Sequence, residues 1–489
     1  MLTADQIRTF IENDRTSTKK QHAMTGLRYY EGEHDIKGHR IFFIDANGEP
    51  REDKTKNNIK ICHPFFTELV DQAVQYMLSG KDGFIKSDIP ELQTFLDEYF
   101  NDNEDFMSEL YEILTGCIVK GFEYAYAYKR QDERTGFQCA DSIGVVEVKA
   151  KDTDDHCEYV IFWYVDRLGK DNKKITRVQV WDDKQTHFFM QEDDGQIKPD
   201  ASQEINPRPH IIYHKDGDAS TYFEGYGFIP FFRLDNCRKQ YSDLKPIKAL
   251  IDDYDLMSCG LSNNIQDTAE ALYVVKGFQG DDLDELMTNI KAKKHIGVDE
   301  DGGVEVHTVD IPYQARQAKL ELDEKNIYRF GMGFNSNQIG DGNITNIVIK
   351  SRYALLDLKC NKLEIRLKQF MRKLLKVVLA EINEEHETDY QQKDVYFDFE
   401  REVMTNAADN AQIELTEAQT RQTEVNTIKT AFAEIGDEKA LELICEQFDI
   451  DYTELKSKLP KKDDETWISP TEAMKEIEGA PAGDVIPVA

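Results

Sequence analysis

The feature that most constrains this chain is a long stretch that contains neither glycine nor proline. It runs from Gly342 to Gly436 and is the longest such gap in the sequence. Because glycine and proline are the residues least compatible with a helix interior, the stretch favours long helices. We expect one helix from Lys350 to about Glu385, roughly 50 Å long at about 1.5 Å per residue. A short strand, VYFDF, and an alanine-rich helix from about Ala407 should follow it.

The expected long helix is basic, although the chain as a whole is strongly acidic. The 60 Lys and Arg residues face 93 Asp and Glu residues, which gives a formal net charge of −33. The segment from Lys350 to Leu379 holds nine basic and two acidic residues, whereas the chain from Glu381 onward holds 28 acidic and 10 basic ones. The overall balance argues against a protein that grips nucleic acid or an anionic membrane over its whole surface.

Enzyme and metal motifs are missing from the sequence. It contains no phosphate-binding loop, no GxGxxG after a strand, no GxSxG and no HExxH. The eight cysteines are scattered without a CxxC pair, so we expect reduced thiols, no metal site and no cofactor. Asp299 to Gly302 resembles the start of a calcium loop, but the remaining ligands are absent. With no apolar run of about 18 residues and no signal peptide, the chain is expected to be soluble.

The first half of the chain changes its hydrophobic period. Helical patterns up to Lys120 include runs that begin at Pro64, at Pro90 and at Asp105. From Phe122 to about Lys215, short β-type runs alternate with polar turn clusters, one of them at residues 133–136. This pattern predicts an antiparallel meander and excludes a Rossmann-type domain. The fold class is therefore α+β and mainly helical.

Two proline-started helices flank a compact insert in the middle of the chain. The first begins at Pro246, with Asp243 as N-cap and an apolar stripe from Ile247 to Leu272; the second runs from Tyr313 to Phe330. We expect the insert to hold a helix at 282–291 and a hairpin turning at residues 301–303. The Gly331-Met332-Gly333 sequence is interpreted as a helix end. The face opposite the stripe carries acidic residues, namely Asp252, Asp253, Asp255, Asp267 and Glu270.

Such a helical pair has too little core of its own to be stable alone. Its apolar stripe is expected to pack against sister copies in a ring or bundle, and the acidic face could then line a central hole. The residues expected in this packing are Ile247, Ile251, Tyr254, Leu261 and Ile265.

Several segments, in order, resemble the portal proteins of tailed bacteriophages, specifically the SPP1-type family. The matching strings are YYEGEHDI at 29–36, NNIK at 57–60, LSGK at 78–81, GFIPF at 227–231, SDLKPIKALIDDYD at 242–255 and IYRFG at 327–331. Residues 345–349, TNIVI, differ from the small SGxAL-type run that is common in the family.

The resemblance implies a dodecameric ring at one capsid vertex, through which double-stranded DNA is packaged and ejected. It implies terminase, a head-completion adaptor, and capsid and scaffolding proteins as partners, no membrane, and a virion protein made in the host bacterial cytoplasm. The implied parts are a β-rich wing (1–241), a first stem helix (242–275), a clip (276–312), a second stem helix (313–333), a tunnel loop (334–349), a spine helix with a return strand (350–403), a helical crown (404–459) and a flexible tail (460–489).

Two sets of contact residues follow from this resemblance. Those closest to DNA in the tunnel loop are expected to be Asn335, Ser336, Asn337, Gln338 and Asn343. Those in the clip that would meet terminase and adaptor are Lys276, Asp282, Lys291, Lys293, Lys294, Asp299 and Glu300.

An uncharged loop and an acidic bore suit a channel in which DNA must slide, because Lys and Arg contacts to phosphate would hold it. The basic long helix could instead be a DNA track, but its charges, Lys359 and Arg366 among them, are expected to pair with acids of neighbouring copies. Two alternatives stay open at this point: an acidic scaffold or adaptor of another assembly, and a soluble hydrolase built on the β region.

Overall fold

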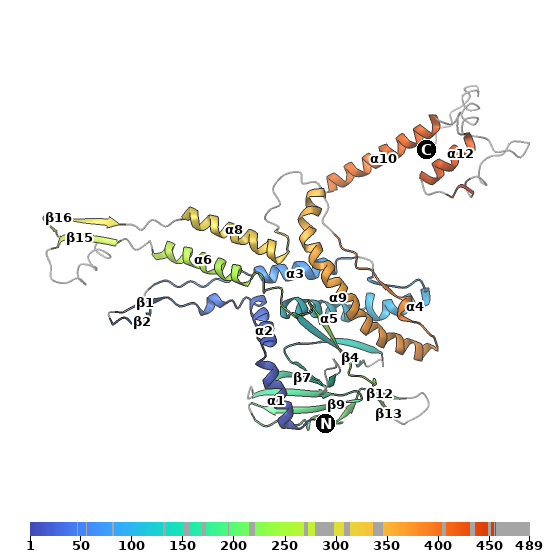
Figure 1. Ribbon diagram of the computed structural model, residues 1–489, viewed down its shortest axis with the longest axis horizontal. Coiled ribbons are helices and arrows are strands. Elements are labelled where there is room, and N and C mark those ends of the chain that lie inside the picture. Colours follow the sequence, from blue (N-terminus) through green and yellow to red (C-terminus); the bar gives the residue numbers. More distant parts are fainter. Residues whose placement is uncertain are drawn as a thin grey trace, which may run out of the picture. The chain divides into compact units, whose positions relative to one another are not determined.

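The structure is a computed structural model of the chain (Figure 1). It describes residues 1–45, 47–54, 56–80, 83–130, 134–149, 157–168, 173–193, 195–214, 221–267, 272–278, 298–307, 313–335, 346–402, 407–430, 436–447, 451–453 and 455. The chain divides into two compact units. The first comprises Met1–Ile339 and Arg352–Glu402, and the second comprises Gly340–Ser351 and Val403–Ala489.

The fold is mixed α+β and about half helical, with ten α-helices among the described residues. The N-terminal helices are α1 (Ala4–Arg15), α2 (Thr18–Tyr30), α3 (Phe65–Met77), α4 (Pro90–Leu96) and α5 (Glu104–Lys120). Short helical turns occur at η1 (Asp35–Gly38), η2 (Asp97–Asn101) and η5 (Gln392–Asp394). The helix expected to begin at Pro90 ends at Leu96 and continues as a π-helical turn from Asp97. In the part of the chain that is described, no helix has the length and apolar character that a bilayer crossing requires.

The strands form small antiparallel sheets, as the period-two pattern predicts. One sheet has the order β10-β9-β8-β7-β6, with β11 paired to β9. Its strands are β6 (Val145–Lys149), β7 (Cys157–Leu168), β8 (Lys173–Trp181), β9 (Gln185–Glu192), β10 (Lys198–Pro199) and β11 (Arg208–Pro209). A second sheet has the order β14-β4-β5 and consists of β14 (Phe231–Asp235), β4 (Phe122–Lys129) and β5 (Thr135–Ala140). Strand β5 begins where the sequence suggested a turn cluster, because Thr135 and Gly136 already pair with β4.

Helices α1 and α2 pack against these sheets. Ile7 of α1 is buried among the aliphatic side chains of the larger sheet, and Ala23 of α2 is buried with Phe122 and Trp181. Helix α2 also lies very close to α5: a Cβ atom added to Gly26 would be 2.0 Å from the Val119 carbonyl oxygen. Glycine at this position therefore permits the close approach of the two helices.

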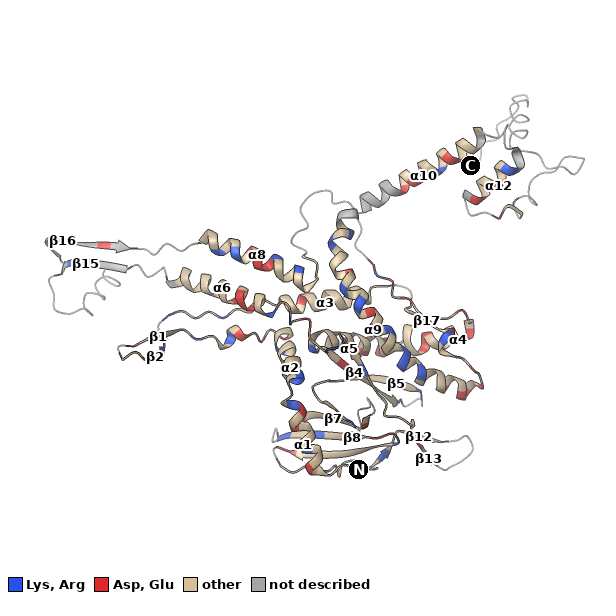
Figure 2. Cartoon of the chain, viewed as in Figure 1, with Lys and Arg blue, Asp and Glu red and all other residues tan. Residues whose placement is uncertain are grey.

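Helix α9 (Asn346–His386) confirms the long helix that the glycine- and proline-free stretch predicts. Its buried positions recur every three or four residues, so one face lies in the core of the first unit. Buried residues of α9 are Leu356, Cys360, Leu363, Leu367, Phe370, Met371, Leu374, Leu375, Val377, Val378, Leu379 and Ile382. Figure 2 shows Lys and Arg positions, in blue, distributed along the same helix. Beyond α9, β17 (Tyr396–Phe397) pairs with β3 (Ile85–Lys86).

The middle of the chain forms the two expected helices, α6 (Lys248–Asp267) and α8 (Tyr313–Gly331), which pack against each other. Two predictions here are wrong. The first helix ends at Asp267 and Leu272 begins a strand, because the β-branched and aromatic run of β15 (Leu272–Phe278) pairs with β16 (Val298–His307). For the same reason residues 301–303 lie within β16 and are not a hairpin turn, with Gly303 opposite Lys276.

Two further antiparallel pairs are β1 (Phe42–Ile44) with β2 (Pro50–Glu52), and β12 (Ile211–His214) with β13 (Thr221–Glu224). The second unit contains α10 (Ala407–Thr430) and α12 (Asp437–Gln447), which contact each other. The helix expected from about Ala407 is thus confirmed.

Candidate functional site: the base of the helical pair

Segments far apart in the sequence meet at the N-terminal half of α6. His34 follows α2, His63 precedes α3, and Asp255 lies on α6. The Asp255 carboxylate is fully buried, with His34 Nδ1 at 2.6 Å from one oxygen and His63 Nδ1 at 2.7 Å from the other. The backbone N–H of His63 also donates to this carboxylate at 3.0 Å. The acidic face expected on this helix therefore needs correction at Asp255, which points into the protein.

The His34 ring is held through both of its nitrogens. Its Nδ1 faces the Asp255 carboxylate, and its Nε2 lies 3.2 Å from the Tyr29 carbonyl oxygen. Both ring nitrogens thus lie within hydrogen-bond distance of protein oxygen atoms. Burial raises the pKa of Asp255, but the hydrogen bonds from His34 and His63 outweigh it and hold that pKa below its usual value. The cluster thus connects the segments of His34 and His63 to α6 through buried hydrogen bonds to the Asp255 carboxylate.

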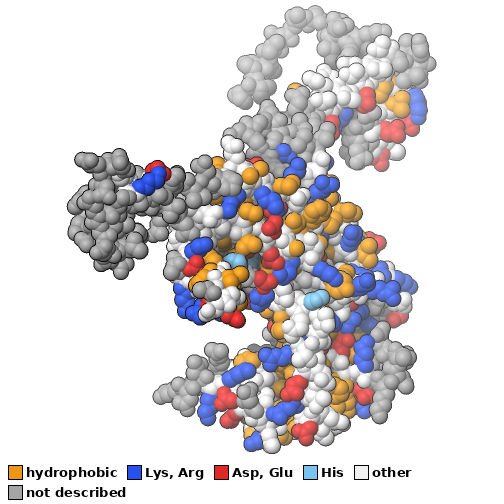
Figure 3. Space-filling model, turned by 60° about the vertical axis from the view of Figure 1, so that its left-hand side comes forward, with side chains coloured by type: hydrophobic (Ala, Val, Ile, Leu, Met, Phe, Trp, Pro, Cys, Tyr) orange, Lys and Arg blue, Asp and Glu red, His pale blue; other side chains and the backbone are white. Residues whose placement is uncertain are grey.

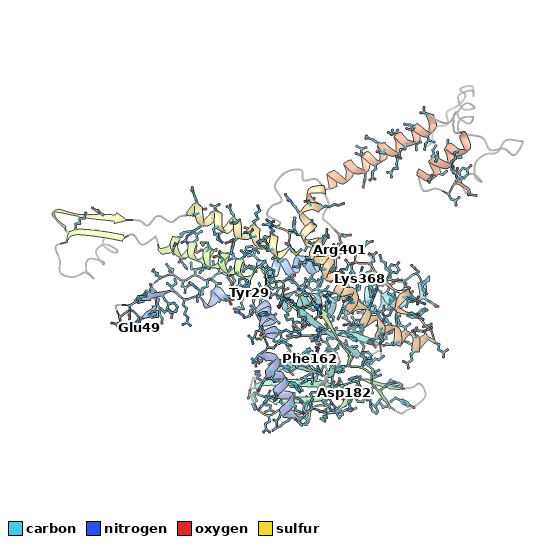
Figure 4. All side chains as sticks on the ribbon, viewed as in Figure 1. Tyr29, Glu49, Phe162, Asp182, Lys368 and Arg401 are labelled. Carbon is cyan, nitrogen blue, oxygen red and sulfur yellow. The ribbon has the colours of Figure 1, made fainter. Side chains whose placement is uncertain are left out.

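A second polar group joins α2 and η1 to α6. The Tyr29 ring stacks on His34 with centroids 4.6 Å apart, and its hydroxyl donates to Asp252. Lys248 bridges Asp252 at 2.8 Å and Asp35 at 2.6 Å. Burial raises the pKa of the Asp35 carboxyl, but the hydrogen bonds from Lys248 and Arg28 lower it by a larger amount. The pKa is therefore below its usual value, at about 2. Figure 4 labels Tyr29 at this junction of α2 with the helical pair.

His34, Cys62 and Asp255 offer ligand atoms that all lie within 4.8 Å of one another, so these residues could hold a metal ion. The 2.6 Å separation of His34 Nδ1 from Asp255 is that of a hydrogen bond. Two ligands of one zinc ion, each about 2.0–2.2 Å from it, would be roughly 3.3 Å apart in tetrahedral geometry. The geometry therefore fits a hydrogen-bonded cluster better than a metal centre. Sequence reasoning missed this cluster, although two of its members lie in the matching strings. His34 belongs to YYEGEHDI and Asp255 to SDLKPIKALIDDYD.

Helix α8 ends against α3, which fixes where the following loop begins. The Tyr328 hydroxyl donates to Glu68 at 2.6 Å. A Cβ atom on Gly333 would lie 2.0 Å from the Leu69 side chain, and Met332 has a left-handed φ of 57°. The prediction that the Gly331-Met332-Gly333 sequence ends the helix is thus confirmed.

The first residues after α8 are held by side chains of α3 and α9. Gln72 accepts from the Phe334 backbone N–H at 3.0 Å and donates to its carbonyl at 2.8 Å. The Phe334 ring stacks on Tyr353, and Asn335 donates to Glu324 at 3.1 Å. Of the five residues expected nearest to DNA, Asn335 is described; Ser336, Asn337, Gln338 and Asn343 lie outside the described residues.

The residues expected in the clip are only partly described. Lys276 on β15 is exposed and pairs with Glu305 on β16 at 2.6 Å. Asp299 and Glu300 belong to β16. Asp282, Lys291, Lys293 and Lys294 lie outside the described residues, as does the helix expected at 282–291.

The residues expected to pack between sister copies divide into two groups. Ile247 and Ile251 are buried within their own chain, which corrects the prediction for these two. Tyr254 is half-buried against His63 and Phe65, Leu261 is half-buried, and Ile265 is exposed. Among the other acids of α6, Asp253 pairs with Lys319 of α8 at 2.5 Å.

The basic helix α9 finds some of its acids in its own chain. Lys359 pairs with Asp243 at 2.9 Å, and Lys368 pairs with Glu364 at 2.7 Å. The prediction that Lys359 pairs with a neighbouring copy is therefore wrong. Arg366 makes no ion pair within the described part of the chain, so its pairing stays a prediction.

This arrangement of a helical pair, a long helix and small antiparallel sheets is accompanied by a match to a known protein family. The model of the family described as "Phage portal protein, SPP1 Gp6-like" matches residues 10–447. The chain belongs to this family, which consists of structural proteins and not of enzymes.

Two individual relatives agree with this assignment. The portal protein of Bacillus phage SPP1 is 29% identical over 354 residues, which cover 71% of this chain and 68% of the relative. The portal protein of Clostridium phage phiCD119 is 24% identical over 429 residues, covering 84% of this chain and 88% of the relative. The function of the chain is therefore that of a phage portal protein, as the resemblance of its sequence strings implies.

Proposed function

We propose that copies of this chain form a closed ring of twelve at one capsid vertex and that double-stranded DNA passes through its centre. The observation that carries this proposal is the junction at the base of α6. There, residues of two family-like strings (29–36 and 242–255) hold one end of the helical pair to the N-terminal part of the chain. A joint of this kind would keep the helical pair at a fixed angle in every copy, as a symmetric channel requires.

The parts of the portal are assigned in the same proposal. Helices α6 and α8 would be the stem, β15 and β16 with residues 276–312 the clip, α9 the spine, and α10 and α12 the crown. The clip would meet the terminase and later the head-completion adaptor. The whole would be a virion component that assembles with capsid and scaffolding proteins in the host bacterial cytoplasm.

The tunnel loop would begin at Phe334, where Gln72 and Tyr353 hold the backbone. Residues 334–349 carry one acid, Asp341, and no base. Such a loop would touch the DNA without neutralising its phosphates, and the DNA could slide.

The assembly state tests the ring directly. Purified full chain should form closed particles with an axial hole in negative-stain images, and native mass spectrometry should give twelve times the 56.5 kDa chain mass. A single species of 56.5 kDa at micromolar concentration would contradict the proposal.

The charge of the loop should set how readily DNA moves. We expect the substitutions Asn335→Lys, Asn337→Lys and Asn343→Lys, made together, to slow DNA packaging by about tenfold at low salt, because each new lysine can pair with phosphate. The slowing should lessen as salt is raised. Packaging is measured as nuclease-protected DNA per particle over time. The matched control is Asn13→Lys on the exposed face of α1, which should package normally; equal rates for loop and control variants would count against the sliding loop.

A further inference from the structure

One side of α9 carries basic side chains that form no ion pair with another described residue. They are spaced three, four or seven residues apart, so they share one side of the helix. The two acids between residues 350 and 379, Asp357 and Glu364, pair with Arg401 instead. These basic residues are called the basic stripe and are Lys362, Arg366, Lys373 and Lys376.

The basic stripe faces away from α3. Cys360 Sγ donates to the Ala73 carbonyl oxygen at 3.8 Å, and Asp357 accepts from the Tyr76 hydroxyl at 2.6 Å. These contacts mark the side of α9 that packs against α3. Lys362 is two residues beyond Cys360 and therefore lies about 200° around the helix, on the outer side.

Helix α3 has the opposite charge character on its own outer side. It contains no Lys or Arg. A groove of about 570 Å³ runs along it, and Phe65, Glu68 and Asp71 are among the residues that line it. Asp71 and Gln75, another lining residue, are each two positions from Ala73, about 200° around the helix. The groove thus faces away from α9.

Helix α5 extends the acidic surface of this groove. The Tyr30 hydroxyl donates to Asp71 at 2.9 Å. Burial raises the pKa of Tyr30, and so do the hydrogen bond to Asp71 and the nearby Glu112 carboxylate of α5. Lys120, the one basic residue of α5, is buried beside Asp141 at 2.7 Å. We call the surface formed by Glu68, Asp71 and Glu112 the acidic groove; no described Lys or Arg forms an ion pair with these three acids.

We infer that the basic stripe of one copy docks on the acidic groove of the next copy. A closed head-to-tail ring needs two different, complementary surfaces on each chain. The stripe and the groove are opposite in charge, and they lie on opposite sides of the contact between α9 and α3. This inference rests on the ring of the proposed function and specifies one of its contacts.

The stripe fits a protein surface better than it fits DNA. Leu355 and Leu358 lie four and seven residues before Lys362, on the same side of α9, and are 40% and 49% exposed. DNA phosphates would pair with the lysines but offer these leucines no apolar contact, whereas the acidic groove has Phe65 beside its carboxylates. Figure 3 shows Lys and Arg side chains, in blue, beside hydrophobic ones, in orange, on the face that this view brings forward.

Charge reversal of each surface tests the contact. The stripe variant carries Lys362→Glu with Arg366→Glu. The groove variant carries Gln75→Lys with Glu112→Lys, which leaves the hydrogen bond of Asp71 in place. Each variant alone should raise the concentration at which half the chain is in rings by at least about tenfold at low salt, because like charges would then face each other. The increase should shrink as salt is raised.

The matched control reverses two lysines elsewhere in the first unit. Lys173→Glu with Lys198→Glu changes exposed positions of β8 and β10 and alters the net charge as much as the stripe variant does. This control should assemble like the wild type. Melting temperatures of the unassembled chains should agree, because none of the changed side chains is buried.

Mixing the two variants separates contacts between copies from contacts within one copy. The reversed stripe of one variant can meet the reversed groove of the other, and the two native surfaces can meet in the same way. An equimolar mixture should therefore form rings of alternating copies at the wild-type concentration, although neither variant does so alone. A mixture that forms no rings, while the wild type forms them, would overturn the contact and leave the ring intact.

Cross-linking tests the other possible occupants of the stripe. Carbodiimide treatment of wild-type rings mixed from ¹⁴N and ¹⁵N chains should join Lys362 to acids of α3 or α5 between light and heavy copies. Cross-links of Lys362 solely to residues 403–489 of its own copy would overturn the contact. So would normal rings from the stripe variant that bind less short duplex DNA than wild-type rings. Failure of the wild-type chain to form rings would overturn the ring and the contact together.

Discussion

Replacing Asp255 by alanine is expected to lower the free energy of unfolding by about 3–5 kcal/mol, the typical cost of breaking a buried ion pair. Without the carboxylate, His34 keeps a buried ring nitrogen that has lost its partner, and the backbone N–H of His63 loses its acceptor. The change is measured by urea denaturation of the full chain at fixed protein concentration. Hydrogen exchange should show faster opening of α6, whose base would no longer be held.

The matched control is Asp253→Ala, two residues away on the same helix. Asp253 also pairs with a cation, Lys319, but both side chains are more than one-third exposed. An exposed pair contributes about 0–1 kcal/mol, so this variant should remain close to wild type. Equal losses of unfolding free energy in the two variants would show that the buried cluster stabilises the fold no more than an exposed ion pair does.

Replacing Leu367 by alanine should cost about 2–5 kcal/mol, because Leu367 is fully buried on the inner face of α9 and the change leaves a cavity. The inner face of this helix is also held at its end, where Glu381 accepts from Tyr99 at 2.8 Å and from the Thr135 N–H at 3.0 Å. Neighbouring side chains can therefore collapse only partly into the space. Thermal and urea unfolding of the full chain measure the loss.

Ile365→Ala is the control for this helix. Ile365 is 61% exposed, two residues from Leu367, and the substitution changes helix propensity in the favourable direction. Its stability should stay within about 0.5 kcal/mol of wild type. A loss as large as that of Leu367→Ala would mean that the inward face of α9 is assigned incorrectly.

The two sites connect the energetics of the fold to its function. The Asp255 cluster holds one end of the helical pair. The other helix of the pair, α8, ends against α3: Tyr328 of α8 bonds to α3, and Gln72 of α3 holds the first residue of the next loop. A change at the base of α6 is thus expected to reach the proposed channel through packed helices and without DNA contact.

Local patterns in the sequence determined much of this protein. The glycine- and proline-free stretch specified α9, the period-two runs specified an antiparallel meander, and the two prolines specified α6 and α8 to within a few residues. These features depend on backbone propensity and on which side chains alternate, and both are readable within a short window. The order of the strings also sufficed to indicate the portal family.

The tertiary structure alone decided which polar residues are buried and which apolar residues are not. Asp255 was assigned to an acidic outer face because its own helix gives no hint of His34 and His63, which are about 200 residues away in the chain. Likewise, Leu272–Phe278 became a strand because β16 offers it backbone partners, and Ile251 is buried whereas Ile247 to Ile265 was expected to form one continuous packing stripe. Burial and ion pairing are long-range properties: they depend on which distant segments meet, and no local pattern contains that information.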